Sequence, residues 1–159
     1  MPVTNLLGGE ISTAVNSAVL EHGTDSEELI PILLAVNEHL GYLPTQAMAE
    51  ISKLMSIPIS RVYSVASFYE LLSTEPRGRH VLQFCESAPC HVMGGRQLFR
   101  AILEELELQP GETSSDGKWT FITTSCLGTC GVGPVLIIDD ELIGNVTPGM
   151  LPALLARYE

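Results

Sequence analysis

Basic side chains are scarce in this chain, which has eight Lys and Arg against nineteen Asp and Glu and a formal net charge of −11. A nucleic-acid-binding surface needs a stripe of basic groups that neutralise phosphates, and the sequence has no such stripe. Nucleic acid is therefore excluded as a partner. The acidic balance either keeps the chain soluble or favours a partner protein with a basic docking face, because opposite charges steer association.

Long apolar runs are also missing. Strictly aliphatic runs, such as Val-Leu-Ile-Ile at residues 135–138, are far shorter than the ~20 residues that a membrane-spanning helix needs. No basic segment precedes an apolar stretch at the N-terminus, so we do not expect a secretory signal peptide. A cytoplasmic location is predicted. In that reducing environment, paired cysteines are more typical of metal binding than of disulfides.

The four cysteines fall into two close pairs. Four residues separate Cys85 from Cys90, three separate Cys126 from Cys130, and 35 lie between the pairs. Each pair can occupy one loop, so two loops brought together would place four thiolates around one inorganic centre. Both [2Fe–2S] clusters and structural zinc are bound in this way. No cysteine is left over, and we therefore expect all four to act together.

Residues 1–75 have the apolar periodicity of successive helices, with apolar side chains recurring at three- and four-residue steps. Asp25 begins a capping-box pattern ahead of the second helix, and Gly41 is a typical C-terminal cap. The short connections favour an N-terminal four-helix bundle. The predicted helices cover residues 11–22, 29–40 and 45–55, and a fourth opens at 56–58 and continues through 72.

A segment with Pro and Gly at residues 73–78 marks a boundary between two predicted domains, 1–75 and 76–159. In the second domain, each cysteine pair follows a predicted strand, and strand ends in one sheet can present two loops at the same edge. The order β-α-β-β-β-α is typical of a thioredoxin-like α/β (α+β) layer. The elements predicted are strands over 79–84 and 118–124, a helix over 94–108, a hairpin over 135–146 and a helix over 148–158.

Cysteine spacing favours a [2Fe–2S] cluster and leaves zinc open as the main alternative. Structural zinc sites use similar pairs, although they usually stabilise small domains that lack a core of their own. A thioredoxin-type dithiol is disfavoured because the sequence has no C-x-x-C motif. A Rieske centre needs two histidines, whereas His91 is the one histidine in the two ligand loops.

Several motifs resemble the thioredoxin-like [2Fe–2S] subunit of NADH:quinone oxidoreductase (complex I), whose relatives occur in NAD-linked hydrogenases and formate dehydrogenases. The resemblance covers about residues 25–155 and includes the cysteine pattern C-x₄-C-x₃₅-C-x₃-C without departure. The other matching segments are Gly-Tyr-Leu-Pro at 41–44, Val-Ala-Ser-Phe-Tyr at 65–69, Pro-Arg-Gly at 76–78, Gly94, Gly-Glu-Thr at 111–113, Asp-Gly at 116–117 and Pro134.

The resemblance implies that Cys85, Cys90, Cys126 and Cys130 hold one [2Fe–2S] cluster. It implies an electron-transfer subunit without catalysis of its own, whose partners are a flavoprotein that binds FMN and NAD(H) and further iron–sulfur subunits. Such a complex can lie against a membrane without this chain entering it. The sequence agrees in one respect, since it has no G-x-G-x-x-G dinucleotide fingerprint. The alternative function is a zinc-stabilised interaction module.

Some residues have two interpretations. His91 either tunes the cluster or is an ordinary loop histidine. Phe68 and Tyr69 belong either to a partner interface or to the core of the helical half. Trp119 is predicted to fill the core of its domain. Packing roles are also predicted for the methionines Met48, Met55 and Met93.

Overall fold

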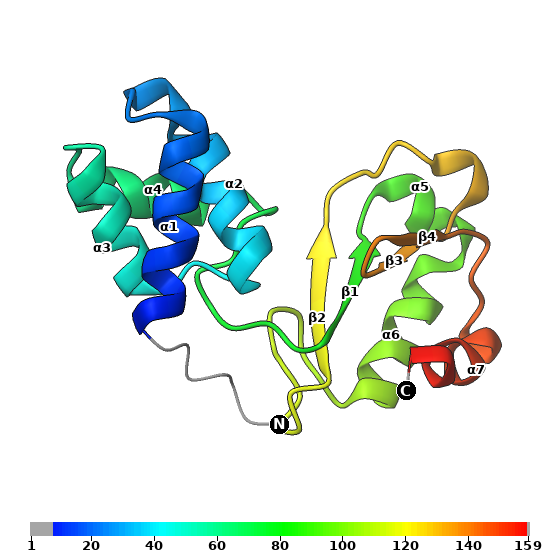
Figure 1. Cartoon of the computed structure of the whole chain (residues 1–159). Coiled ribbons are helices and arrows are strands. Elements are labelled where there is room, and N and C mark those ends of the chain that lie inside the picture. The colour runs from blue at the N-terminus through cyan, green and yellow to red at the C-terminus, as the bar shows by residue number, and fades with distance from the viewer. Residues whose placement is uncertain (1–7, 159) are drawn as a thin grey trace. The chain divides into compact units, whose positions relative to one another are not determined.

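The computed structural model describes residues 8–158, which form two compact units divided between Pro76 and Arg77 (Figure 1). Each unit has its own hydrophobic core. The start of the predicted first domain, residues 1–7, lies outside the described part. Within residues 8–158, every helix is too short or too polar to cross a lipid bilayer.

The first unit is helical, as the periodicity predicts. Helix α1 packs against α2 and α3, and α4 packs against α3 and α2. Side chains at three- and four-residue spacing, such as Ile32, Leu33 and Val36 of α2, are fully buried in the shared core. Met48 and Met55 lie in the same core, as predicted. The α-helices are α1 (Gly8–His22), α2 (Leu29–Leu40), α3 (Thr45–Leu54) and α4 (Ile59–Phe68).

The prediction for the C-terminal end of α2 is confirmed, whereas the prediction for its N-terminal end is wrong. Gly41 ends the helix with φ 79°, a left-handed conformation that glycine adopts without a Cβ clash, and its N–H donates to the Asn37 carbonyl. The capping box at Asp25 is wrong. A 3₁₀ turn, η1 (Ser26–Glu28), intervenes, so α2 begins only at Leu29 and the Asp25 side chain makes no capping hydrogen bond.

Helix α4 is shorter than predicted. It ends at Phe68 rather than Leu72, because Tyr69 adopts an extended conformation with ψ 119°. This break lets the chain turn so that Leu72 enters the core. The core interpretation of Phe68 and Tyr69 is wrong, since these side chains are 77% and 40% exposed and their rings meet edge to face.

The second unit is a four-stranded sheet with helices, in the strand order β2-β1-β3-β4. The β1 and β2 arrows point the same way (Figure 1), and these strands pair in parallel, whereas β3 is antiparallel to β1 and to β4. The strands are β1 (His80–Cys85), β2 (Trp119–Thr124), β3 (Leu136–Ile138) and β4 (Glu141–Ile143). The α-helices are α5 (Ala88–Cys90), α6 (Arg96–Leu106) and α7 (Leu151–Leu155), with a π-helical turn η2 (His91–Gly95) before α6.

One face of this sheet carries the core. Residues paired across the strands, such as Leu82 with Phe121 and Ile138, point to the same side and are fully buried. Helices α6 and α7 pack on them and on each other. Trp119 is 7% exposed within this core, as predicted, whereas Met93 is 47% exposed and its predicted packing role is wrong.

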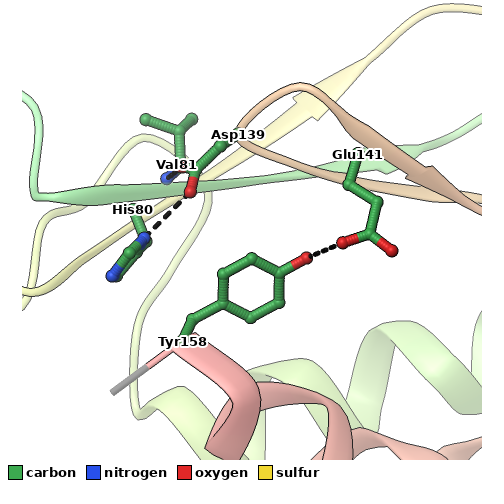
Figure 2. A network of polar contacts seen from close by, with 5 residues as sticks. All are labelled: His80, Val81, Asp139, Glu141 and Tyr158. Atoms are coloured by element: carbon green, nitrogen blue, oxygen red, sulfur yellow. Dashed lines mark hydrogen bonds and ion pairs between the residues drawn. The ribbon is translucent and has the colours of Figure 1, made fainter.

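A polar network fixes the C-terminal end of the chain against the sheet (Figure 2). The Asp139 carboxylate contacts His80 Nδ1 at 2.9 Å and accepts the Val81 N–H at 2.9 Å. The Tyr158 hydroxyl donates to Glu141 at 2.6 Å. The network therefore ties β1, the β3–β4 hairpin and the last 3₁₀ turn together at the start of β1. The first cysteine of the chain, Cys85, lies at the opposite end of the same strand.

Candidate metal centre

Parallel pairing brings the two cysteine loops to one sheet edge. Cys85 is the last residue of β1 and lies opposite Thr124, the last residue of β2. The Glu86 N–H donates to the Thr124 carbonyl at 3.0 Å, so pairing continues to the end of both strands. Cys126 follows two residues later. Because the carboxyl ends of parallel strands meet at the same edge, the predicted convergence of the loops is confirmed.

The loops are held together by a small apolar cluster. Cys85 and Cys90 are buried against Val135, and Leu127 of the second loop packs on this group. The Cys85 N–H also donates to the Val135 carbonyl at 3.3 Å. Leu127 lies between the cysteines of the second pair, so its packing brings the second loop onto the first. The first pair is therefore inside the protein, whereas Cys126 is exposed.

The sulfur atoms of the second pair lie close to each other. Cys126 Sγ and Cys130 Sγ are 3.5 Å apart, and the Gly128 N–H donates to Cys126 Sγ at 3.4 Å. Gly128 has φ +77°, which side-chain-bearing residues rarely adopt. Gly133 lets the backbone approach the first pair, because a Cβ on it would lie 3.3 Å from Cys90 Sγ. Glycines thus allow the second loop to wrap around sulfur.

In each pair, one thiol has a lowered pKa and therefore ionises more readily. Burial opposes ionisation of Cys85, but hydrogen bonds from the backbone N–H groups of Ser87 and Leu127 outweigh it and lower the pKa of this thiol. The Gly128 N–H, with further hydrogen bonds from neighbouring side chains, lowers the pKa of Cys126. The Ser87 side chain contributes to both shifts. Thiolate is the form that binds metal.

The other thiol of each pair is stabilised in its protonated form. Burial and the hydrogen bond with Cys85 raise the pKa of Cys90. The hydrogen bond with Cys126 raises the pKa of Cys130, with burial adding to it. In each pair, one thiol therefore holds its proton more strongly than the other. A cation bound between the loops would displace these protons, since metal binding to cysteine releases them.

The residues fit a [2Fe–2S] cluster. All four cysteines are free thiols. In the described part of the chain, no three His, Cys, Asp or Glu side chains already surround a point where a single ion would bind. Two side-chain polar atoms in residues 8–158 are buried without a hydrogen-bond partner, His91 Nδ1 and Thr129 Oγ1. Each belongs to a residue adjacent in sequence to one of the cysteines, so both unpartnered polar groups belong to the segments that carry the cysteines.

Sequence reasoning found the cysteines and missed their supporting residues. Ser87 hydrogen-bonds sulfurs of both loops, and Leu127 packs one loop on the other. A hydroxyl residue inside a cysteine loop was the available signal for Ser87 and for Thr129. The contact of Leu127 with the first loop depends on how the two loops meet. His91 lies beside Cys90, and its ring stands edge-on to Phe84 at 6.4 Å between centroids.

Known proteins are similar in sequence to this chain over most of its length. The model of the thioredoxin-like [2Fe–2S] ferredoxin family matches residues 15–159. A subunit of the NADH-quinone oxidoreductase of Escherichia coli strain K12 is 36% identical over 154 residues, which are 94% of this chain and 93% of that protein. The HndA subunit of the NADP-reducing hydrogenase of Solidesulfovibrio fructosivorans is 31% identical over 130 residues, 82% of this chain and 76% of that protein.

Solved structures show the same fold. The NAD+-reducing [NiFe]-hydrogenase in its air-oxidized state superposes with a TM-score of 0.70 at 24% identity, over 82% of this chain. The matched region is 22% of that longer hydrogenase chain, so this chain corresponds to one part of it. The resemblance noted from the sequence motifs is confirmed by the family match and by the relatives. This chain belongs to the thioredoxin-like [2Fe–2S] ferredoxin family, and its cofactor is a [2Fe–2S] cluster rather than zinc.

Proposed function

We propose that this chain is the electron-transfer subunit of an NAD-linked oxidoreductase complex and that Cys85, Cys90, Cys126 and Cys130 hold its cluster. The observation that carries the proposal is the convergence of the two cysteine loops at the carboxyl ends of β1 and β2. When bound, a [2Fe–2S] cluster takes up and releases single electrons. The chain's own part is to hold this centre rigidly and to control its contact with solvent.

The arrangement of the four thiols supports their assignment as ligands. They are all the cysteines that the chain has. Cys85 and Cys126 have lowered pKa values because N–H groups point at their sulfurs, and such N–H groups also stabilise bound thiolates. Cys85 and Cys90 are buried whereas Cys126 is exposed. One side of the centre would therefore be shielded, and the other would face a partner.

The partner we propose is a flavoprotein subunit that binds FMN and NAD(H), within a complex that contains further iron–sulfur subunits. The curated relatives named above are subunits of an NADH-quinone oxidoreductase and an NADP-reducing hydrogenase. This sequence has no dinucleotide fingerprint of its own. A hydride carries two electrons, and a flavin is the group that converts hydride transfer into single-electron steps. NAD(H) chemistry therefore belongs to the partner.

The helical unit also has a role in the proposed function. We interpret residues 1–75 as a four-helix bundle that helps to bind the flavoprotein, and residues 76–159 as the cluster domain. Exposed Phe68, Tyr69 and Leu71 follow one another closely at the end of α4, and aromatic side chains are enriched where proteins bind each other. We place the complex in the cytoplasm, peripheral to a membrane where its other subunits require one, with no nucleic-acid partner.

Metal analysis and reduction test the function. The chain purified without oxygen should contain about two irons and two acid-labile sulfides. Dithionite should reduce it, whereas excess NADH should not. Adding the flavoprotein subunit of the complex should make reduction by NADH possible. Stoichiometric zinc without sulfide would support the zinc-stabilised module instead, and binding of FMN or NADH by this chain alone would contradict the division of roles.

A ligand variant tests the site. Cys126→Ala should abolish or strongly distort the visible absorption and the EPR signal of the reduced protein, while the flavin of the partner is still reduced by NADH. Ser125→Ala is the matched control, because Ser125 is exposed and directly precedes Cys126. Its spectra should equal those of the unmodified chain. Normal spectra in Cys126→Ala would remove Cys126 from the ligand set.

A further inference from the structure

Two buried polar atoms stand out by their position. In residues 8–158, His91 Nδ1 and Thr129 Oγ1 are the buried side-chain nitrogen and oxygen atoms without a hydrogen-bond partner. Buried polar groups are nearly always hydrogen-bonded, because an unsatisfied one loses its hydration without compensation. The chain follows this rule elsewhere. Thr120 Oγ1, for example, is buried and accepts the Gly78 N–H at 2.6 Å.

Thr129 lies in the loop whose ends are Cys126 and Cys130. Two backbone groups of this loop already have partners. The Thr129 carbonyl accepts the Val132 N–H at 3.1 Å, and the Gly128 N–H donates to Cys126 Sγ at 3.4 Å. The ends of the loop bring two sulfurs to within 3.5 Å of each other. The loop therefore has a sulfur acceptor at each end and, between them, a buried hydroxyl without a partner.

His91 directly follows Cys90, the second cysteine of the first loop. Its backbone N–H donates to the Ser87 carbonyl at 3.1 Å, which places its ring at the turn that carries Cys90. The ring stands at 89° to the ring of Phe84, which is fully buried directly before Cys85. Phe84 therefore limits the ring's movement on one side. With the proton on Nδ1, His91 has one donor turned to the interior.

We propose that the Thr129 hydroxyl and the His91 Nδ1–H donate hydrogen bonds to sulfur of the [2Fe–2S] centre and raise its reduction potential. This inference rests on the proposed function, since it needs the four cysteines as ligands. Reduction adds negative charge to the sulfur atoms, and a donor interacts more strongly with the more negative state. The two residues are tuning residues, which adjust the centre through hydrogen bonds and do not bind iron.

An EPR-monitored redox titration of the full-length protein at fixed pH tests the proposal. Thr129→Val keeps the shape and removes the hydroxyl, so the reduced-to-oxidised ratio at a given potential should fall by up to about tenfold, equivalent to about 59 mV for a one-electron couple. Thr129→Ser should restore the original potential. Thr147→Val is the control, because Thr147 is exposed and lies outside both cysteine loops; its potential should not change.

His91 is tested in the same way. His91→Leu should lower the potential in the same direction, and His91→Asn, which keeps a donor near the δ position, should return it towards the original value. Thr129→Ala serves as a second variant if Thr129→Val assembles poorly. Loss of assembly in both variants would assign Thr129 to assembly rather than tuning and would overturn the proposal for this residue.

Other outcomes also decide whether the tuning proposal stands. An unchanged potential in Thr129→Val and His91→Leu overturns the proposal, as does a shift that Thr129→Ser fails to reverse, because that shift would come from packing. These failures are distinct from failure of the proposed function. A chain without iron and sulfide contradicts the function before any potential is measured, whereas a normal cluster with unchanged potentials contradicts the tuning alone.

Discussion

Gly95 is the position at which one added carbon should disturb the candidate metal centre most directly. It is buried where η2 meets α6, and its φ of −57° is one that alanine adopts freely. A Cβ at this position would lie 2.6 Å from the carbonyl oxygen of Cys90 and 2.9 Å from its carbonyl carbon. An ordinary contact begins at 3.4 Å, so the Cys90 carbonyl must move by about 0.8 Å, the difference between 3.4 and 2.6 Å. Backbone atoms cannot rotate away, and the move displaces a proposed ligand.

Gly95→Ala should therefore reduce both stability and cluster content. Overpacking of this kind costs about 1–3 kcal/mol. The single tryptophan of the chain, Trp119, is buried in the second unit, so its fluorescence during urea unfolding of the metal-free protein reports on this unit. Iron and sulfide per chain should fall in the same variant.

The control for this prediction is another glycine next to a ligand. Gly131→Ala meets no atom within 4 Å and needs no positive φ. Alanine at such a compatible position leaves stability unchanged or raises it by about 0.4–1 kcal/mol. If Gly95→Ala unfolds at the same urea concentration as the unmodified chain, or if Gly131→Ala is equally damaging, the steric argument is refuted.

Two further predictions concern the C-terminal network and the two units. The hydrogen bond from Tyr158 holds the pKa of Glu141 below its ordinary 4.5 (Figure 2), so its stabilisation is complete above that pH and is lost as the pH falls through the lower folded-state pKa. Tyr158→Phe should make the loss of stability below about pH 5 less steep in urea unfolding, and an unchanged pH profile would contradict this. A fragment of residues 75–159 should assemble the cluster but bind the flavoprotein more weakly than the full chain in a titration. Equal affinity would show that the helical unit is not needed for binding.

Much of the molecule follows from local sequence patterns. Helices of the first unit were predictable because their buried faces repeat every three to four residues, as in Ile32, Leu33 and Val36. Strand β1 and the position of Cys85 at its end follow from alternation. The four cysteines were identified as candidate metal ligands by their spacing, since two closely spaced pairs leave few other ways for them to act. Gly41 was predictable as a helix end because its special conformation is a local property.

Local pattern failed where distant contacts decide. Asp25 has the residue type of a cap, yet a 3₁₀ turn separates it from α2. Phe68 is a large apolar residue of the kind that usually fills a core. Because α4 ends at this residue, its side chain is exposed to solvent while Leu72 turns inward. Such outcomes depend on how the chain folds back over its core, which periodicity does not record.

Some properties of the metal centre follow from the sequence, and others follow only from the tertiary structure. Residue type and spacing were enough to single out four thiols as the candidate ligands, because no other cysteine competes with them. The convergence of the two loops was predicted from the strand that precedes each pair, whereas the parallel pairing of β1 with β2 that produces it became apparent only in the folded chain. The same holds for the hydrogen bonds from Ser87 to sulfurs of both loops and for the burial of the Thr129 hydroxyl. Candidate ligands can be read from residue type and spacing, whereas burial and hydrogen bonding, which set thiol pKa values and cluster potential, exist only once two distant loops meet.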